Sequence, residues 1–593
     1  MRYRIAMPEP HSHLFHVEAE LEAPGAEAVL ALPVWTPGSY LVREFARHLE
    51  GFEAAGEGGA PLPWERIDKH RFRVRAGGAA RLRARYRVYA HDLTVRTSHL
   101  DGSHGYWNGA SVLLFAEGRL AEPCRLEVAA PPGWRVTTAL AGGPDVFTAR
   151  DYDELADSPV EAGTHALAAF TALGAEHRVA AWGRGPVDLG AFTADLKAVV
   201  EQAAAALGPL PYDRYLFLVH LSDRRRGGLE HARSTTLHVD RHGFAPREAY
   251  EETLSLAAHE HFHAWNVKRL RPAALQPYDY GREQYTRLLW WFEGVTSYYD
   301  HLLLARAGLL PAGRWLRHLG EEWSWLLRTP GAGKMSLEEA SLTAWVKYYR
   351  QDENTGNSAV SYYRKGELVA LALDLLLRRH GRSLDELLRL LLARHAEGGL
   401  PEDGVERAVA GWLGDEAARA FFDRHVRGTA ALEADLESVG LSLRTRAAQG
   451  PEDDGGTPGK EEEGNGPPGW LGAELDAEGE VGSVREGGPA WRAGLYAGDE
   501  IVAEGGLRTD RKGLLQRVRQ RGPAGSVRLH LFRRDELLQI EVPLAAPPHD
   551  TAWLEPAGAP TAAQREAFRA WCGAEHPGGD PDLRGAPAGN GPV

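Results

Sequence analysis

The sequence predicts a multidomain α+β protein with an all-β domain at its N-terminus, a helical middle and a small separate domain near its C-terminus. Three observations support this fold class. The chain has 593 residues, whereas single hydrophobic cores rarely exceed about 250–300. Apolar residues alternate with polar ones in the first part, as in strands, and recur at helical spacing in the middle. A segment almost without apolar residues then separates the last compact stretch from the rest.

Residues 1–165 are predicted to form the all-β domain. The segment 81–90 alternates arginine with apolar residues, which is typical of a half-buried antiparallel strand with a solvated arginine face. Three further pairs repeat the alternation between Pro and Gly turns: Phe72/Val74, Leu126/Val128 and Val136/Thr138. Because the net charge is −14, we expect no nucleic-acid binding.

The next stretch, residues 166–312, contains a metal-binding motif. Apolar residues recur at helical spacing from Phe192 to Ala203, and 214–221 has the pattern of a buried strand. The sequence His259-Glu-His-Phe-His263 follows, after a flank with the spacing of a buried helix.

Two histidines of this motif can hold one metal ion. Positions i and i+4 of a helix share a face, so His259 and His263 direct their imidazoles to the same side. Glu260 lies beside them and can act as a general base on a water molecule. His261 faces away and is excluded as a ligand. The alternative is a chance match in a chain with 25 His and 82 acidic residues, and the helical context argues against it.

A third ligand is predicted on a second apolar helix, Tyr285 to Leu304. Glu293 lies there among leucine, tryptophan and phenylalanine, where a carboxylate is costly unless it is paired or bound to metal. Two His and one Glu leave the fourth tetrahedral position open, which is the arrangement of a catalytic zinc site. We therefore expect one zinc ion per chain.

The remaining chain divides by composition. Helical patterns continue through 313–448, the predicted helical domain. Residues 449–466 are rich in Gly, Pro, Asp and Glu and are predicted to be a linker. A compact unit of about 80 residues, 467–547, follows. Residues 548–593 hold one short helix, Ala562 to Cys572, and a Gly/Pro-rich end that is expected to be loose.

Three segments offer further chemistry, each with a plain alternative. Gly228 lets an extended peptide approach a strand edge, where Glu230 can meet a cationic group; the alternative is a hairpin turn. Tyr363, at the head of an apolar helix, can donate a hydrogen bond to an oxyanion, or only contribute to packing. Asp300 lies two turns after Glu293 and can accept a hydrogen bond from a ligand histidine, or lie at the surface.

Several segments together resemble the glycyl aminopeptidase family of gluzincin metallopeptidases, in order from about residue 30 to the last domain. They are Trp35–Phe45, His259–Pro272, Trp291–Tyr299 and Tyr362–Gly366. The resemblance implies an N-terminal β domain, a thermolysin-like zinc catalytic domain, a helical domain and a C-terminal PDZ domain. It also implies peptide substrates with small N-terminal residues, Gly or Ala.

The wider gluzincin aminopeptidases imply roles for three residues. Their G-x-M-E-N segment holds the substrate's free amino group through its Glu, which corresponds to Glu230, although Leu229 and His231 depart from that pattern. The tyrosine of their Y-x-K-G segment stabilises the oxyanion and corresponds to Tyr363. The acid two turns after the zinc-binding Glu corresponds to Asp300, where the wider group tends to have Glu.

The compact C-terminal unit resembles a PDZ domain by itself. Residues 488–501 are similar to the small helix and G-D-x-I segment of such domains. The carboxylate-binding loop then falls on Trp470, Leu471, Gly472 and Ala473. A hairpin around Arg534-Asp535 and a helix over 510–520, the other wall of the groove, complete the expected fold. Such a domain binds the C-terminus of a peptide by strand addition.

The sequence thus predicts a zinc aminopeptidase that acts on peptides. One alternative is an endopeptidase, which keeps the zinc chemistry without the role of Glu230. The other is a PDZ-bearing binding protein whose metal site is vestigial. The N-terminus lacks the apolar core of a secretory signal, and the longest apolar stretch is far short of the about 18 residues that span a bilayer. With only two Cys, the chain is expected to be cytoplasmic and not membrane-bound.

Overall fold

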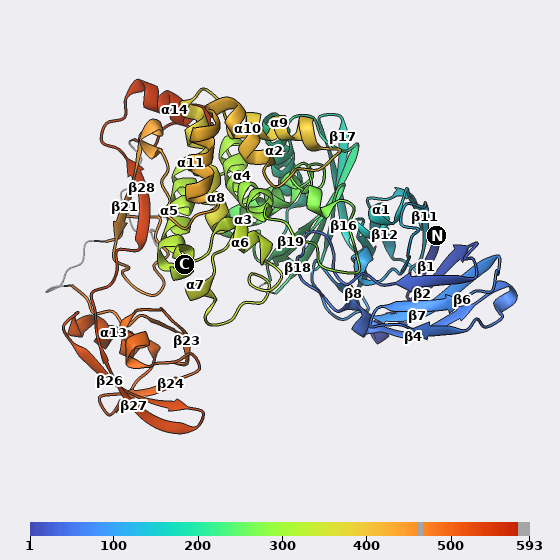
Figure 1. Cartoon of the computed structure of the whole chain (residues 1–593), viewed down its shortest axis with the longest axis horizontal. Coiled ribbons are helices and arrows are strands. Elements are labelled where there is room, and N and C mark those ends of the chain that lie inside the picture. The colour runs from blue at the N-terminus through green and yellow to red at the C-terminus, as the bar shows by residue number, and fades with distance from the viewer. Residues whose placement is uncertain (224, 461–466, 579–593) are drawn as a thin grey trace. The chain divides into compact units, whose positions relative to one another are not determined.

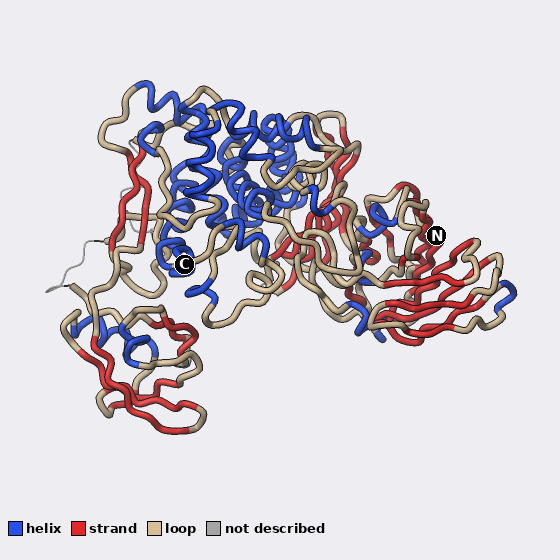
Figure 2. Tube along the Cα trace, viewed as in Figure 1, coloured by secondary structure: helices blue, strands red, loops and turns tan. Residues whose placement is uncertain are grey.

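The computed structural model describes residues 1–223, 225–460 and 467–578 (Figure 1). The chain forms two compact units. The first comprises Met1–Thr286, Tyr299–Leu309 and Asp385–Ala408, and the second comprises Arg287–Tyr298, Leu310–Leu384 and Val409–Val593. The N-terminal region is rich in strands and the middle of the chain in helices (Figure 2), so the predicted α+β class is confirmed.

Three sheets form the N-terminal region. The largest has the strand order β13-β14-β11-β1-β2-β7-β4, and the others have the orders β10-β3-β6-β5 and β12-β15-β9-β8. Their strands are β1 (Arg2–Ala6), β2 (Leu14–Glu22), β3 (Glu27–Ala31), β4 (Leu49–Ala55), β5 (Trp64–Arg66), β6 (Arg71–Arg75), β7 (Arg81–Tyr89), β8 (Ser98–Leu100), β9 (His104–Trp107), β10 (Phe115–Ala116), β11 (Cys124–Ala129), β12 (Arg135–Thr138), β13 (Ala141–Gly142), β14 (Val146–Ala149) and β15 (Val160–Gly163).

Strand β7 has the alternation that the sequence predicts. Its apolar side chains are buried and its arginines lie on the other face. Arg83 and Arg85 form ion pairs with Glu20 and Glu18 of the neighbouring strand, at 3.2 and 2.8 Å. The arginine run therefore faces acidic partners on the same sheet, which gives it a structural explanation.

Strand β12 differs from the prediction, because its other face is buried. Thr137 is buried, whereas Val136 and Thr138 are only partly buried. The Thr137 hydroxyl forms a hydrogen bond of 2.8 Å with Nε2 of buried His165. A polar partner from a distant segment thus decides which face of this strand lies inside.

A five-stranded sheet follows, with the order β16-β17-β18-β20-β19. Its three middle strands are parallel, and β16 and β19 pair antiparallel at its two edges. The strands are β16 (Ala166–Ala172), β17 (Ala175–Trp182), β18 (Arg214–Ser222), β19 (Gly227–Glu230) and β20 (Ser234–Asp240). Helices α2 (Leu189–Leu207) and α3 (Arg247–Phe262) contact this sheet, and α2 buries the predicted apolar face from Phe192 to Ala203.

The second apolar helix begins later than predicted. Residues 285–288 are not helical, and the helix starts with a π-turn, Trp290–Gly294, before α4 (Val295–Arg306). The Thr286 hydroxyl donates to Glu402 at 2.8 Å, so a distant carboxylate anchors this segment, which has no regular secondary structure. A π-turn is rare and often marks a functional position, and here it contains Glu293.

The helical middle is built around α8 (Arg364–Arg379), which is buried over most of its length. In the second unit α8 lies beside α5 (Ala312–Arg328) (Figure 1). Buried Asp374 of α8 accepts hydrogen bonds from the Tyr298 hydroxyl and the Leu384 N–H, both at 2.8 Å. The remaining helices of this region are α6 (Leu337–Leu342), α7 (Thr355–Ser358), α9 (Leu384–His395), α10 (Gly404–Leu413) and α11 (Asp415–His425). Within the described residues, no helix is both long and apolar enough to cross a membrane.

Lys365 of α8 yields a stability prediction. Its side chain is 2% exposed, its ammonium has no hydrogen-bond partner among the described residues, and burial lowers its pKa to about 8. The unfolded chain keeps the proton up to about pH 10.4, so stability rises with pH between these two values, by about 3 kcal/mol in all. Below pH 8 the full cost of burying the charge is present. Lys365→Met should therefore raise the thermal midpoint at pH 7.

The check is a pair of thermal unfolding series at pH 7 and pH 10. The advantage of Lys365→Met should shrink at pH 10, because the buried lysine is then neutral. Exposed Lys347→Met is the control and should change little at either pH. An advantage that does not depend on pH would mean that packing, rather than charge burial, is responsible.

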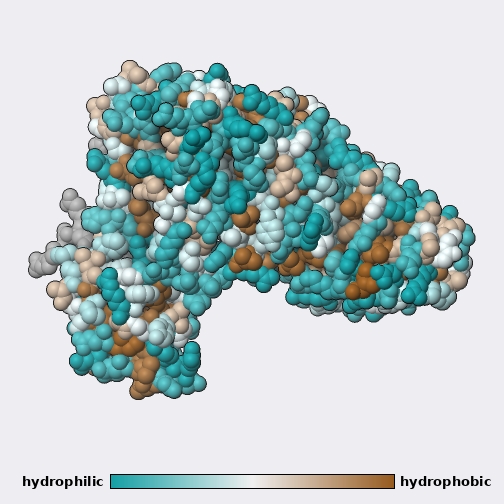
Figure 3. Space-filling model, viewed as in Figure 1, coloured by the Kyte–Doolittle hydropathy of each residue, from teal (hydrophilic) through white to brown (hydrophobic). Residues whose placement is uncertain are grey.

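Within the second unit, residues 467–547 form the compact C-terminal unit that the sequence predicts. It contains a four-stranded sheet of order β25-β24-β26-β27 and a β22–β23 pair around its own apolar core. The predicted hairpin is confirmed, with Arg534 and Asp535 in left-handed conformations at its two-residue turn. Figure 3 shows hydrophobic surface over this hairpin, where Leu537 is 63% exposed. The elements are β22 (Ala473–Leu475), β23 (Val481–Val484), α12 (Pro489–Ala493), β24 (Glu500–Glu504), β25 (Leu507–Arg508), α13 (Arg511–Arg521), β26 (Ser526–Arg533) and β27 (Glu536–Pro543).

The predicted linker and the C-terminal end contact the helical core of the second unit. The described part of the linker contains no helix or strand, but Arg446 holds Asp453 by an ion pair and the Gly456 N–H donates to the Ala552 carbonyl at 2.8 Å. Ala552 belongs to β28 (Thr551–Pro556), which pairs with β21 (Leu441–Arg446). Helix α14 (Ala562–Cys572) has the predicted bounds and begins with a capping box. The end of the predicted loose tail, 579–593, lies outside the described residues.

Candidate metal and catalytic centre

The end of helix α3 brings two imidazoles together as the spacing predicts. His263 follows the last helical residue but keeps helical dihedrals, φ −61° and ψ −19°. The Nε2 atoms of His259 and His263 lie 3.2 Å apart. Two nitrogens bound to one tetrahedral zinc at about 2.0–2.1 Å would be separated by about 3.3 Å. The histidine pair therefore fits a zinc ion without rearrangement.

The outer nitrogens of both rings have partners. His263 Nδ1 lies 2.8 Å from the Asn266 carbonyl, and His259 Nδ1 lies 3.2 Å from Asp300 Oδ2. Burial raises the pKa of Asp300, but His301 and His259 outweigh it and hold the pKa well below its usual value. Asp300 is therefore an ionised acceptor. Such partners fix the tautomer that leaves Nε2 available to a metal.

Two carboxylates lie beside this pair. Oxygens of Glu230 and Glu260 and a ring nitrogen of His263 all lie within 4.8 Å of one another, and all three residues are buried. Gly228 contacts Glu260 so closely that a Cβ on it would lie 2.0 Å from Glu260 Oε1. The predicted glycine therefore makes room for the predicted base. A larger residue at 228 would displace that carboxylate.

Glu230 ends the edge strand β19, and the turn after it is anchored from a distance. Asp157 accepts hydrogen bonds from His231 Nδ1, the Ala232 N–H and the Lys268 ammonium, at 3.0, 2.8 and 2.8 Å. A cavity of about 690 Å³ borders this turn and is lined partly by Asp157, Ala232 and Lys268. Glu230 Oε1 is buried and has no hydrogen-bond partner among the described residues.

Sequence reasoning missed this support. Asp157 and Lys268 are 111 residues apart, and Asp157 belongs to no recognisable motif. Gly38 is a second omission, since a Cβ there would lie 2.4 Å from Glu230 Oε1. The signal for Gly38 and Lys268 was their presence in the segments Trp35–Phe45 and His259–Pro272.

Glu293 and Tyr363 lie in the second unit, where two glycines bring their segments together. A Cβ on Gly294 would lie 2.5 Å from Gly366 Cα, so the π-turn and the start of α8 touch backbone to backbone. Burial first, and then the Glu293 carboxylate and neighbouring tyrosines, raise the pKa of Tyr363 well above its usual value. Its phenol therefore stays protonated and can donate a hydrogen bond.

The predicted carboxylate loop of the C-terminal unit lies directly before β22. Trp470 N donates to the Ala545 carbonyl at 2.9 Å, and Leu471 is buried in the core of that unit. Gly472 has φ +77°, a conformation that favours glycine. Ala473 is the first residue of β22.

Known proteins similar to this chain are peptidases. Residues 2–164 match the Peptidase M61 N-terminal domain, and residues 252–369 match the M61 glycyl aminopeptidase family, a stretch that holds every residue from His259 to Tyr363 discussed above. An aminopeptidase N family protein from Idiomarina loihiensis has a crystal structure with a TM-score of 0.90 and 33% identity, over 96% of this chain and 99% of that one.

More distant structures include an M1 zinc metallopeptidase from Deinococcus radiodurans, with a TM-score of 0.47 and 14% identity over 73% of this chain and 94% of that one. Yeast LTA4 hydrolase in complex with bestatin has a TM-score of 0.44 and 11% identity, over 73% and 68%. No curated protein matches the chain.

Proposed function

The chain belongs to the M61 glycyl aminopeptidase family and is a zinc aminopeptidase, and we propose that it removes single small residues, Gly or Ala, from the N-termini of peptides. The observation that carries the proposal is the convergence of His259, His263, Glu260 and Glu230 on one spot. In this proposal the thermolysin-like catalytic domain is 166–312 and the helical domain 313–448.

The proposed ligands are His259, His263 and Glu293, for one catalytic zinc ion per chain. When bound there, zinc supplies a Lewis acid and lowers the pKa of a water molecule. Glu260 accepts a proton from the attacking water and returns it to the leaving amine. Tyr363 donates a hydrogen bond to the oxyanion, and Glu230 holds the substrate's ammonium. Asp300 keeps the His259 ring in place.

Hydrolysis of Gly- and Ala-arylamides tests the function. We expect wild-type protein to cleave both, to lose activity with a chelator and to regain it with zinc. His263→Ala should lose the zinc ion of the catalytic site and should not recover activity, because one nitrogen ligand is gone. Full zinc occupancy of the catalytic site in this variant would contradict the ligand assignment. Intact wild-type protein that cleaves neither substrate would favour the vestigial-site alternative.

Tyr363→Phe should lower kcat with little effect on KM, because the phenol matters only once the oxyanion has formed. Loss of one oxyanion donor costs roughly 10²–10³-fold in rate. The matched control is Tyr348→Phe, since this ring stacks on Tyr363 with centroids 5.1 Å apart and has no proposed role. Steady-state kinetics that show equal rates for Tyr363→Phe and wild type would leave Tyr363 with a packing role only.

We propose further that residues 467–547 are a PDZ domain that binds a peptide C-terminus. Among the described residues, neither the Leu471 nor the Gly472 N–H donates a backbone hydrogen bond, which leaves both for a carboxylate. Strand β22 and helix α13 supply the two walls of the groove. The full-length protein should bind a peptide with a free C-terminus more tightly than its amide. Equal affinities would contradict this assignment.

A further inference from the structure

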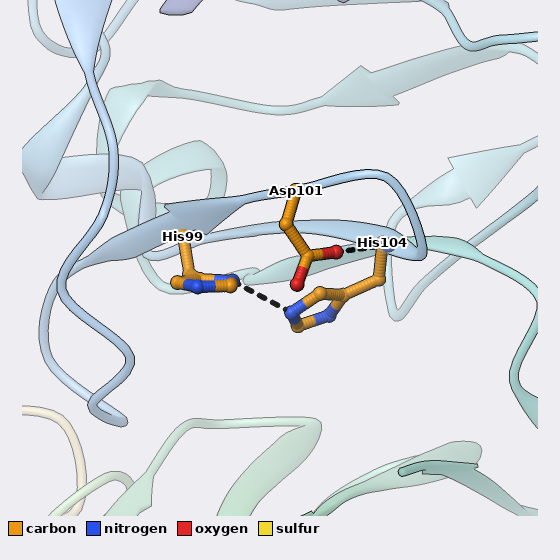
Figure 4. A group of neighbouring side chains, drawn as sticks. All are labelled: His99, Asp101 and His104. Carbon is orange, nitrogen blue, oxygen red and sulfur yellow. Dashed lines mark hydrogen bonds between the residues drawn. The ribbon is translucent and has the colours of Figure 1, made fainter. Parts of the chain in front are cut away.

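A second group of metal-ligating side chains lies on the hairpin of β8 and β9, in the first unit and apart from His259 and His263. His99 and Asp101 are two residues apart, so they share one face, and His104 begins the returning strand opposite Asp101, whose N–H donates to the His104 carbonyl. Figure 4 shows the three side chains pointing toward one another. One ligand atom from each lies within 4.8 Å of the others, and His99 Nδ1 is 2.9 Å from His104 Nε2.

The Asp101 carboxylate is held in position by one of its oxygens. Its Oδ1 accepts hydrogen bonds from the Ser103 N–H and hydroxyl, both at 2.7 Å, and from the His104 N–H at 3.1 Å. The other oxygen points toward the two imidazoles (Figure 4). The turn therefore already fixes the Asp101 side chain, and a ligand at its other oxygen would cost little further side-chain conformational entropy.

Glu161 orients the His104 ring in the way that a carboxylate orients a metal-binding histidine. Its two oxygens lie 2.9 Å from His104 Nδ1 and 2.9 Å from His220 Nε2, and all three residues are buried. With one oxygen on each ring nitrogen, the Glu161 carboxylate accepts a hydrogen bond from both rings. His104 then carries its proton on Nδ1 and directs the lone pair of Nε2 toward His99. This is the carboxylate–histidine arrangement of metal sites.

The charges of this group lack a cationic partner. Asp101 and Glu161 form no ion pair with Lys or Arg among the described residues. Glu161 is fully buried and Asp101 is partly buried, and a buried carboxylate is costly unless a cation balances its charge.

We propose that His99, Asp101 and His104 bind a second divalent ion of the zinc class. Two imidazole nitrogens and one carboxylate oxygen suit such an ion, and the fourth position is left to water. On binding a tetrahedral ion, the two nitrogens would separate from 2.9 Å to about 3.3 Å. Behind the ligands, Glu161 and His220 tie the hairpin to β15 and β18, so the ion would stabilise this part of the first unit.

Zinc stoichiometry in full-length variants tests the inference independently of catalysis. After chelation and reloading, wild type should hold two ions per chain, His263→Ala one, His99→Ala one and the double variant none. Asp101→Asn keeps an acceptor for the turn but removes the charge, and should also lower the count in the His263→Ala background. Exposed His16→Ala in that background is the control and should leave one ion.

Two further readouts separate this site from the catalytic one. Zinc should raise the thermal midpoint of metal-free His263→Ala but not that of the double variant. Anomalous scattering should place an ion about 2.0–2.2 Å from His99 Nδ1 and His104 Nε2. Equal zinc content in His263→Ala and the double variant would overturn the inference. If wild type holds one ion, and only His99→Ala removes it, the site at His99, Asp101 and His104 is supported. The same result would contradict the proposed catalytic ligands.

Discussion

Glu260→Gln is expected to abolish nearly all peptidase activity and to leave the zinc in place. The amide matches the carboxylate in shape but cannot accept a proton from water, and general base catalysis contributes typically about 10²–10⁴-fold. Since the same group must later protonate the leaving amine, we expect kcat to fall by about 10³-fold or more. The side chain is buried against Gly228, so the isosteric change should not alter its position.

Metal analysis and single-substrate kinetics on the same preparation decide this prediction. Glu251→Gln is a suitable control, since Glu251 is also a buried acid of α3 but is paired with Arg247 at 2.7 Å. It should keep wild-type rates. If Glu260→Gln holds zinc and turns over near the wild-type rate, another group activates the water. Glu230, whose carboxylate also lies within 4.8 Å of His263, would then be the candidate.

The histidine pair was predictable because one helix determines it. A regular helix fixes the relation of positions i and i+4, so the sequence alone placed His259 and His263 on one face, and their nitrogens are 3.2 Å apart in the structure. The link from Asp300 to His259 followed from similar reasoning, since a count of two turns placed Asp300 on the face of Glu293.

Features that depend on distant segments were not predictable. Nothing near Asp157 in the sequence indicates that it anchors the turn after Glu230. The buried face of β12 was predicted wrongly. Alternation gives the period of a strand but does not reveal which face meets a partner, and here the Thr137 face bonds to His165. The predicted helix start at residue 285 was wrong for the same reason, because Thr286 is bonded to Glu402, a residue that is distant in the sequence.

Glu230 decides between aminopeptidase and endopeptidase action. An ammonium held beside this carboxylate would measure the substrate from its end and place the first peptide bond over the metal. Glu230 is 4% exposed, and its Oε1 lacks a hydrogen-bond partner among the described residues, although Lys268 is close enough to attract its charge. A buried acceptor without a partner is costly. Such an acceptor is expected where the ammonium group of a bound substrate supplies the missing hydrogen bond.

Glu230→Gln should therefore lower activity without lowering stability. Removing one partner of a buried charge pair costs 2–5 kcal/mol, so we expect kcat/KM for Gly- and Ala-arylamides to fall by about 10²–10³-fold. The thermal midpoint should stay the same or rise, and zinc content should not change. A purely structural role predicts the opposite, because loss of a carboxylate that held the turn would destabilise the fold.

N-acetylated substrates complete the argument, because acetylation removes the charge from the substrate instead of the protein. Wild type should ignore acetylated Gly- and Ala-arylamides, and Glu230→Gln should show almost no further discrimination between free and acetylated forms. Such a convergence means that both changes remove the same interaction. If wild type instead cuts acetylated peptides internally as fast as free ones, Glu230 is only a turn residue and the enzyme acts as an endopeptidase.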